Sequence, residues 1–120
     1  MQKMIVKKPW GTYEVLLDEP NYKVKRIVVH PYERFSLQYH KHREEHWVIV
    51  EGDGIVQVNE KEYPAYVRTH WVILPTQKHR ATAGPNGLVF IETQTGDCYE
   101  EDIVRLEDDD GRLDSSEVSV

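Results

Sequence analysis

The chain has 120 residues and a mass of 14.1 kDa, with 39% apolar residues, 30% charged residues and a formal net charge of −6 at pH 7. This composition is typical of one soluble globular domain, and the acidic balance argues against nucleic acid as the main partner, because phosphate-backbone binding needs a basic surface. A single cysteine, Cys98, excludes an intrachain disulfide, and no apolar run approaches the roughly 18 residues of a membrane span, so we expect a cytoplasmic protein that does not bind membranes.

The residues near the start of the chain indicate how it could assemble. Residues 7–16, KKPWGTYEVL, are a plausible edge or exchanged strand, and an edge strand leaves backbone groups available for another chain. We therefore expect a homodimer.

Near the other end of the chain an acidic run leads into a segment with almost no apolar residues, so we expect a single domain over residues 1–112 and a flexible tail over residues 113–120.

Short runs rich in Val, Ile, Tyr and Trp recur along the chain, separated by Gly, Pro, Asn or Asp, which is typical of an all-β sandwich or barrel. The expected strands are residues 11–18, 22–30, 35–40, 45–52, 54–60, 61–67, 71–75 and 87–94. Glu51–Gly54 and Asn59–Glu62 are expected to form turns between strands. Only Ile103–Glu107 has a pattern that a short helix could satisfy.

Residues 37–47, LQYHKHREEHW, concentrate side chains that bind metals. If the strand over residues 35–40 forms, Gln38 and His40 project to one face, because side chains alternate along a strand. The next strand would return as the antiparallel partner in a hairpin and bring Glu45 opposite them. Such donors suit a divalent metal with open positions, and His79 is the best candidate for a fourth ligand.

The alternative reading of this stretch is a solvated, charged hairpin without a metal. His30 and His70 stand alone beside strand ends and are expected to be ordinary surface or core residues. His42 falls in the turn, and His46 should point away from the face that carries Glu45. We expect both mainly to support their neighbours, with a direct role left open.

Two stretches resemble the motifs of the cupin superfamily. YERFSLQYHKHREEHWVIVEG is similar to the first cupin motif, with Gln38 and His40 at its two histidine positions, Glu45 at its glutamate and Gly52 at its closing glycine. THWVILPTQKHR is similar to the second motif, in which His79 takes the place of the metal-binding histidine.

The resemblance is closer still to one family. KKPWGTYEVL, YKVKRIVV, SLQYHKHREEHWVIVEG, HR and EEDIVRLEDDDGR follow, in order, the pattern of type II mannose-6-phosphate isomerases over roughly residues 8–112. In larger bacterial enzymes this cupin follows a mannose-1-phosphate guanylyltransferase domain, which no part of this sequence resembles. The resemblance implies an all-β, jelly-roll-like double-stranded β-helix and an aldose–ketose isomerase for mannose 6-phosphate and fructose 6-phosphate. It also implies one divalent metal ion (Zn, Mn or Co), held by Gln38, His40, Glu45 and His79.

Such an isomerase also needs a base near neutral pKa and cations that bind the phosphate of a small phosphorylated sugar. Lys25, Arg43 and Arg80 are the expected phosphate-binding residues, each with an ordinary surface charge as the alternative. Arg80 directly follows a proposed ligand, which makes it a catalytic candidate as well. The base is open between His42 and a metal-bound hydroxide.

Several positions depart from the family pattern. Tyr32 and Thr69 replace the glycines that open the two motifs, Asp110 replaces an aromatic residue, and the loop 75–79 lacks its usual glycine and is one residue short. Two rival functions therefore stay in view. One is a non-catalytic sugar-phosphate-binding cupin, and the other is a different cupin enzyme, such as a nucleotide-sugar isomerase or a metal-dependent dioxygenase, because the barrel hosts many chemistries.

Overall fold

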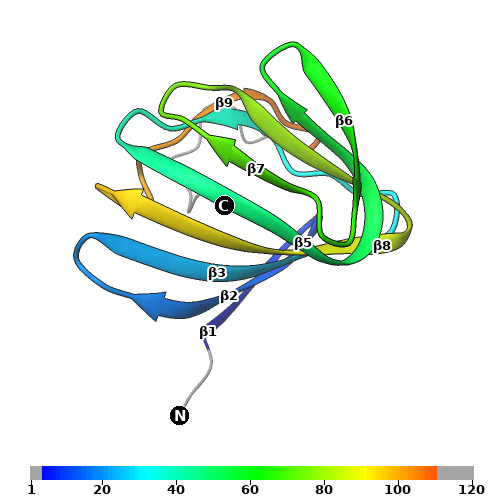
Figure 1. The fold of residues 1–120 in the computed structure, drawn as a ribbon, viewed down its shortest axis with the longest axis horizontal. Helices are drawn as coiled ribbons and strands as arrows, with labels where there is room; N and C mark the ends of the chain where they lie inside the picture. The colour runs from blue at the N-terminus through cyan, green and yellow to red at the C-terminus, as the bar shows by residue number, and fades with distance from the viewer. Residues whose placement is uncertain (1–3, 111–120) are drawn as a thin grey trace.

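A computed structural model describes residues 4–110, which form strands and turns and contain no helix. No helix in this part of the chain is therefore long and apolar enough to span a membrane. The expected tail over residues 113–120 lies outside the described residues. The strands are β1 (Met4–Lys8), β2 (Gly11–Asp18), β3 (Tyr22–Val29), β4 (Leu37–Tyr39), β5 (Arg43–Val58), β6 (Lys61–Tyr66), β7 (His70–Ile73), β8 (His79–Gly96) and β9 (Val104–Glu107) (Figure 1).

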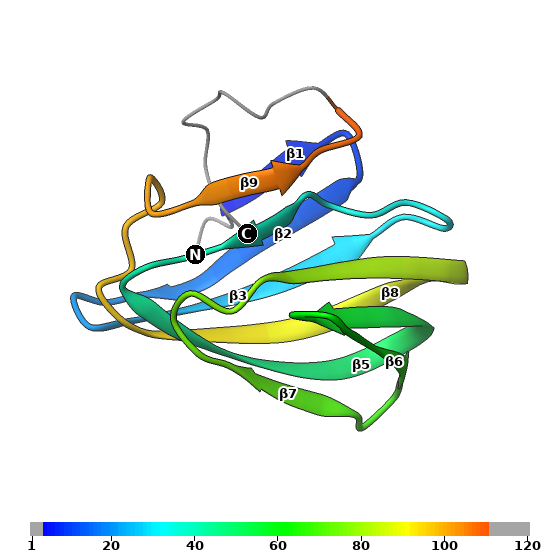
Figure 2. The ribbon, with the colours of Figure 1, turned by 90° about the horizontal axis from the view of Figure 1, so that it is seen from above.

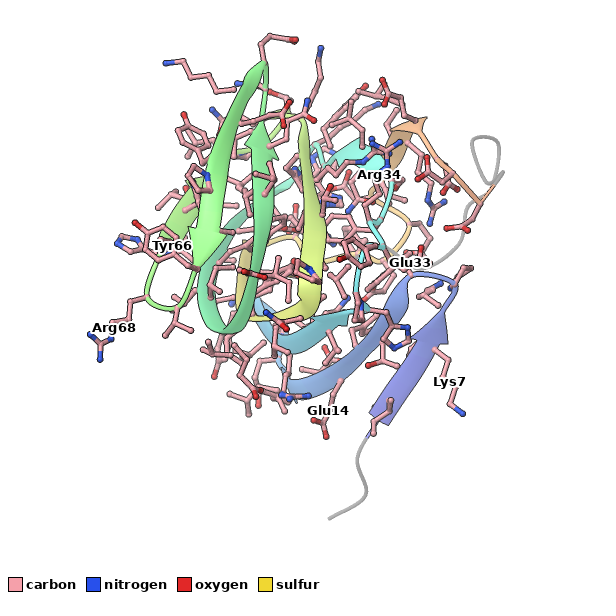
Figure 3. All side chains as sticks on the ribbon, turned by 90° about the vertical axis from the view of Figure 1, so that its right-hand side faces the viewer. Lys7, Glu14, Glu33, Arg34, Tyr66 and Arg68 are labelled. Atoms are coloured by element: carbon pink, nitrogen blue, oxygen red, sulfur yellow. The ribbon has the colours of Figure 1, made fainter. Side chains whose placement is uncertain are left out.

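The strands form one sheet that curls back on itself. Its order is β1-β2-β3-β8-β4-β9, and β5 joins it by pairing with β6, β7 and β8. The two longest strands, β5 and β8, pair antiparallel over both of their halves, and both bend in the middle, so the inner faces of the sheet turn toward each other (Figures 1 and 2). Charged residues such as Lys7 and Arg68 project outward (Figure 3). This arrangement confirms the predicted all-β double-stranded β-helix.

The interior is apolar at one end and polar at the other, because the strands change composition along their inward faces. In the apolar part, Ile27 of β3, Phe90 of β8 and Ile49 of β5 lie in one row across the sheet. Two residues further along each strand the next row is Lys25, Glu92 and Trp47. The row after that is Lys23, Gln94 and Glu45. The buried residues at the polar end are Lys23, Lys25, Gln38, His40, Arg43, Glu45, His79, Glu92, Gln94 and Arg105.

The predicted turn at Glu51–Gly54 was wrong. β5 runs through it without a break, and only the register against β8 shifts there. Gly52 has a φ of +79°, and a Cβ on it would lie 2.0 Å from the carbonyl oxygen of Gly87. The glycine therefore lets two long strands bend in close contact. The other predicted turn is confirmed, since Asn59 lies between β5 and β6 with a φ of +54°.

Three further local features differ from what the sequence suggested. β4 does not form a hairpin with β5 but pairs with β8 and β9. Ile103–Glu107 is not helical, because four of its residues form β9 against β4. The first part of β8, residues 79–86, was not predicted as a strand, because its small residues give no apolar alternation; Ala81 and Ala83 nevertheless pack inward in the core.

Candidate functional site

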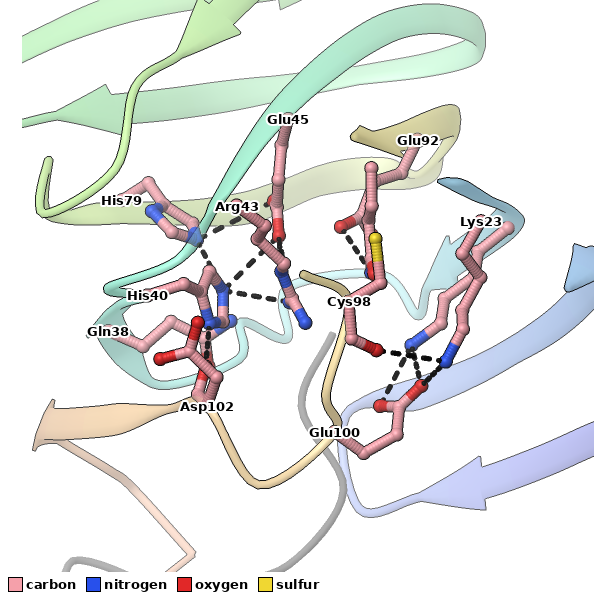
Figure 4. A network of polar contacts seen from close by, with 12 residues as sticks. Lys23, Gln38, His40, Arg43, Glu45, His79, Glu92, Cys98, Glu100 and Asp102 are labelled. Atoms are coloured by element: carbon pink, nitrogen blue, oxygen red, sulfur yellow. Dashed lines mark hydrogen bonds and ion pairs between the residues drawn. The ribbon is translucent and has the colours of Figure 1, made fainter. Parts of the chain in front are cut away.

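His40, Glu45 and His79 converge at the polar end of the interior (Figure 4). His40 follows β4, Glu45 lies in β5 and His79 opens β8, and none is more than 2% exposed. The Nε2 atom of His40 lies 3.2 Å from Glu45 Oε2 and 3.2 Å from His79 Nε2, and His79 Nε2 lies 3.7 Å from Glu45 Oε1. All three ligand atoms lie within 4.8 Å of one another, which suits a shared divalent cation.

Backbone contacts fix the orientation of both rings. His40 Nδ1 lies 2.6 Å from the carbonyl oxygen of Asp102, and His79 Nδ1 lies 2.9 Å from that of Gln77. A carbonyl oxygen only accepts, so each Nδ1 carries the proton and donates it. Each Nε2 is then the acceptor nitrogen of its ring, which is the atom through which a histidine with this contact binds a metal.

Both imidazoles are held in the neutral form that a metal requires. Burial lowers the pKa of His79 to about 4. Burial also lowers the pKa of His40 well below its usual value, and the positive charge of Arg43 lowers it further. A neutral imidazole is the form that ligates metals.

Two side chains hold the carboxylate of Glu45. Trp47 Nε1 donates to Glu45 Oε1 at 3.0 Å, and Arg43 donates to Glu45 Oε2 from Nε and Nη2, both at 2.8 Å. Arg43 Nη2 also lies 3.0 Å from His40 Nε2. The guanidinium, a predicted phosphate-binding group, thus donates to two of the three converging ligand atoms.

Gln38, the fourth predicted ligand, is buried beside the cluster. It is the cross-strand partner of His79, its Oε1 accepts a hydrogen bond from Ser36 Oγ at 2.8 Å, and its Nε2 has no partner among the described residues. Turning the amide about its last torsion would let Nε2 donate to the Ser36 hydroxyl and free the oxygen for a cation. The donor set therefore fits a divalent metal: two imidazoles, a carboxylate and an amide.

The remaining predicted residues divide between the interior and the outer surface. Lys25 lies inside the barrel, fully buried. His42 is exposed beside the polar end and lines a hollow of about 350 Å³ with Tyr99 and Asp102. His30 and His70 are exposed, in keeping with the ordinary role expected of them. His46 is exposed too, points away from the face of Glu45 as expected, and its Nε2 lies 3.1 Å from Glu44 Oε2.

Arg80 projects from β8 to the face opposite His79, because successive residues of a strand alternate. Its Nε donates to the carbonyl oxygen of Phe35 at 2.8 Å, and its two other nitrogens donate to the carboxylate and the carbonyl of Glu107, each at 3.1 Å. These contacts tie β8 to β9 and favour a structural role.

Sequence reasoning missed several polar residues that line the interior, among them Glu92 and Gln94. Glu92 is fully buried, its Oε2 accepts no hydrogen bond from the described residues, and burial together with the charge of Glu45 raises its pKa to about 8. Gln94 donates from Nε2 to Glu92 Oε1 at 3.0 Å and keeps an unpartnered Oε1. The signal was present in the sequence, because Phe90, Glu92 and Gln94 share one face of an apolar strand.

Two departures from the family pattern fall where the backbone favours glycine. Tyr32, at the position of the first motif's opening glycine, has a φ of +63°. In the loop 75–79, which lacks its usual glycine, Thr76 has a φ of +71°. Thr76 also donates its backbone N–H to the carbonyl oxygen of His40 at 2.7 Å, so this loop supports the cluster directly. A positive φ is unfavourable for such side chains.

Comparison with known proteins identifies relatives of the chain. The family described as "Mannose-6-phosphate isomerase C-terminal" matches residues 1–108. A mannose-1-phosphate guanylyltransferase of Klebsiella pneumoniae is 37% identical over 108 residues, which are 88% of this chain and 23% of that protein. The chain thus spans about a quarter of the length of such relatives.

Solved structures show the same fold at low sequence identity. A structure of Streptomyces PAC13 with uridine has a TM-score of 0.77 at 16% identity, covering 88% of this chain and 86% of that one. An RmlC-like cupin from Shewanella frigidimarina has a TM-score of 0.72 at 20% identity, covering 79% and 85%. These likenesses confirm the predicted cupin barrel and carry no statement about activity.

Proposed function

The chain belongs to the family of mannose-6-phosphate isomerase C-terminal cupin domains, and on that basis we propose that it interconverts mannose 6-phosphate and fructose 6-phosphate. One divalent metal ion, Zn²⁺, Mn²⁺ or Co²⁺, would be held by Gln38, His40, Glu45 and His79. The observation that carries the proposal is the convergence of two neutral imidazoles and a carboxylate at the polar end of an enclosed barrel. The relatives are bacterial proteins that include enzymes and an alginate biosynthesis protein by name, which supports the expected cytoplasmic location.

The reaction removes a proton from C2 of the sugar and returns one to C1, and negative charge develops on the oxygens of these carbons. A bound metal ion would supply Lewis-acid stabilisation of that charge. The protein's own residues prepare the site. The carbonyl oxygens of Asp102 and Gln77 orient the imidazoles of His40 and His79. Trp47 and Arg43 hold the carboxylate of Glu45 in place.

Position favours Glu92 over His42 as the residue that moves the proton. The carboxyl group of Glu92 lies inside the polar interior next to Glu45, with one oxygen that accepts no hydrogen bond from the described residues. His42 lies on the surface, and its backbone N–H donates to Asp102 Oδ2 at 2.8 Å. A group that exchanges a proton with the substrate has to reach the interior.

The test is formation of fructose 6-phosphate from mannose 6-phosphate, followed in a coupled assay after chelation and after addition of Mn²⁺, Co²⁺ or Zn²⁺. We expect turnover that depends on the metal, and none with mannose, which lacks the phosphate. Suppose instead that the folded, metal-loaded protein gives no turnover but mannose 6-phosphate raises its melting temperature. The chain would then be a binding module. Turnover of a nucleotide sugar alone, or oxygen uptake with Fe²⁺, would assign it to another cupin chemistry.

A further inference from the structure

Two lysines project into the polar interior from β3. Lys23 and Lys25 are two residues apart and therefore share the inward face. They are 7% and 0% exposed, and lysine is almost never buried to this extent without a partner. The ammonium group of Lys25 lies 4.3 Å from the centre of the Tyr13 ring, and this cation–π contact partly stabilises its charge.

The anionic partner of both lysines comes from the segment between β8 and β9, residues 97–103, which we call the strap. The two carboxylate oxygens of Glu100 bridge the lysines. Lys23 Nζ lies 2.6 Å from Oε1, and Lys25 Nζ lies 3.1 Å from Oε1 and 3.2 Å from Oε2 (Figure 4). Burial would raise the pKa of Glu100, but the two lysines outweigh burial and lower it. Glu100 is therefore charged at neutral pH.

The strap presents further acceptors to the same cations. The carbonyl oxygen of Cys98 accepts from Lys23 at 3.4 Å, and that of Tyr99 accepts from Arg43 at 3.4 Å. Asp18, at the exposed edge, is 3.9 Å from Lys23. A single interior carboxylate from the strap thus bridges two buried ammonium groups, as the oxygens of a bound phosphate would.

The lysines lie at a suitable distance from the proposed metal ligands. Lys25 is the cross-strand partner of Glu92 on β8, and Lys23 is that of Gln94, whose other neighbour is Glu45 on β5. Two strand spacings separate β3 from β5, roughly 9.5 Å, which is comparable to the length of a phosphorylated hexose. The unpartnered oxygens of Glu92 and Gln94 lie between the two groups, where sugar hydroxyls could donate to them.

The strap also closes this part of the barrel. The lysines and the three converging ligands are all buried, so a sugar phosphate cannot reach them without a movement of the covering chain. Beyond Glu100, the strap is held at Asp102, whose carboxylate accepts from the backbone N–H groups of Lys41 and His42, each at 2.8 Å. Of these two attachments, the one at Glu100 is the one an anion can replace.

We propose that Lys23 and Lys25 form the subsite for the phosphate group of the substrate, and that Glu100 fills this subsite as a tethered anion that the phosphate displaces, opening the strap. The proposal rests on the proposed function for the identity of the sugar, but the anion subsite itself needs no turnover. A phosphate monoester carries about −1.5 to −2 charges at pH 7, so it matches two ammonium groups better than one carboxylate does.

The test measures binding of inorganic phosphate by calorimetry. Glu100→Gln keeps the size of the side chain and removes its charge, so we expect phosphate to bind about tenfold tighter or more than to the wild type. Glu101→Gln removes a charge from the neighbouring exposed residue and should change the affinity less than about twofold. Lys23→Gln should weaken binding about tenfold. An affinity within twofold of the wild type for Glu100→Gln or for Lys23→Gln would overturn the proposal, as would the absence of binding in both the wild type and Glu100→Gln.

A second measurement uses the unmodified chain and does not depend on whether the variants fold. Hydrogen–deuterium exchange of residues 97–103 should become faster when phosphate is added, because the strap loses its attachment to the lysines. Unchanged or slower exchange at saturating phosphate would overturn the displacement. If these effects appear without isomerase turnover, only the proposed function fails. If turnover is present and the effects are absent, only the subsite fails.

Discussion

The two Nδ1 contacts of His40 and His79 determine what these rings can bind. Because backbone carbonyls accept from both Nδ1 atoms, both Nε2 atoms are acceptors and cannot hydrogen-bond to each other across the 3.2 Å that separates them. A positively charged group between or beside them satisfies both. Arg43 supplies such a charge to His40 and Glu45, and a divalent metal would supply it to all three ligands.

A variant of one ligand tests this arrangement. We expect His79→Ala to weaken binding of Zn²⁺ or Mn²⁺ more than about 100-fold, because even the partners of metal ligands are worth about 10–100-fold. His70→Ala, at an exposed histidine of β7, should bind the metal like the wild type. Titration calorimetry on chelator-treated protein makes the comparison, and equal affinities for the two variants would exclude His79 from the site.

A second pair of variants separates the two candidates for proton transfer. Glu92→Gln preserves the shape of the interior side chain, and we expect kcat to fall by about 10²–10⁴-fold, the usual contribution of a general acid or base. Metal content should be unchanged. His42→Gln, at the surface, should retain most of the wild-type kcat. The opposite pattern, with His42→Gln inactive and Glu92→Gln active, would return the role to His42.

The three converging residues of the candidate site could be predicted from the sequence, and the residues around them could not. His40, Glu45 and His79 stand out by type and spacing in LQYHKHREEHW and LPTQKHR. Arg43 was expected to bind phosphate, because its partners become visible only when β4, β5 and β8 are placed together. Glu92 lies in a strand that is otherwise mostly apolar. Its inward carboxyl group points to a function only once the fold shows that it lies beside Glu45.

At the scale of the elements, the bends of β5 and β8 build the barrel. Each strand pairs with the other in both layers of the folded sheet, so one bend in each creates an enclosed interior. Gly52 permits the bend in β5, because its φ is positive and its Cα lies against the backbone of Gly87. The site depends on this bend, since Arg43 and Glu45 project inward from the half of β5 that precedes it.

We expect Gly52→Ala to lower the free energy of unfolding by about 2–4 kcal/mol, through unfavourable φ and overpacking against the backbone. Gly84→Ala is a matched control in β8, since its added Cβ would meet the end of the Asp53 side chain, which can move. Urea unfolding monitored by tryptophan fluorescence gives both values. A similar loss in the two variants would show that the bend does not require a glycine at position 52.

The sequence predicted most strands but not their pairing. Apolar alternation located β2, β3 and the second half of β8 closely, because each has one buried face. The turn at Glu51–Gly54 was wrong because glycine occurs at bulges inside strands as well as in hairpin turns. The pairing of β4 with β8 and β9 depends on contacts between residues far apart in the chain. A local sequence pattern gives no information about such contacts.

At the scale of the whole molecule, β1 is the part best placed for assembly. The edge strand expected over residues 7–16 was wrong in part, because residues 11–16 lie in β2, which pairs with β1 on one side and β3 on the other. Among the described residues β1 pairs only with β2, so its outer edge is open to another strand. Its residues Met4 and Ile5 are 59% and 56% exposed. An apolar edge strand of this kind favours the homodimer that the sequence predicts.

Light scattering after gel filtration should therefore give twice the chain mass of 14.1 kDa. We expect Ile5→Lys to shift the protein toward monomer, because it places a charge on the open edge. Val72→Lys, on the exposed face of β7, should leave the mass unchanged. Dissociation by Val72→Lys alone would move the interface to the β7 side, and a monomeric wild type would contradict the dimer altogether.

The central claim is that one metal held in the enclosed polar end of the barrel makes the chain an isomerase. The most direct measurement is the rate of fructose 6-phosphate formation from mannose 6-phosphate by chelated protein as metal is added back, for the wild type and for His79→Ala. We predict a rate that rises from near zero and levels off at about one metal ion per wild-type chain, with no comparable rise for His79→Ala. Full turnover in the chelated protein, or none in folded, metal-loaded wild type, would contradict the account.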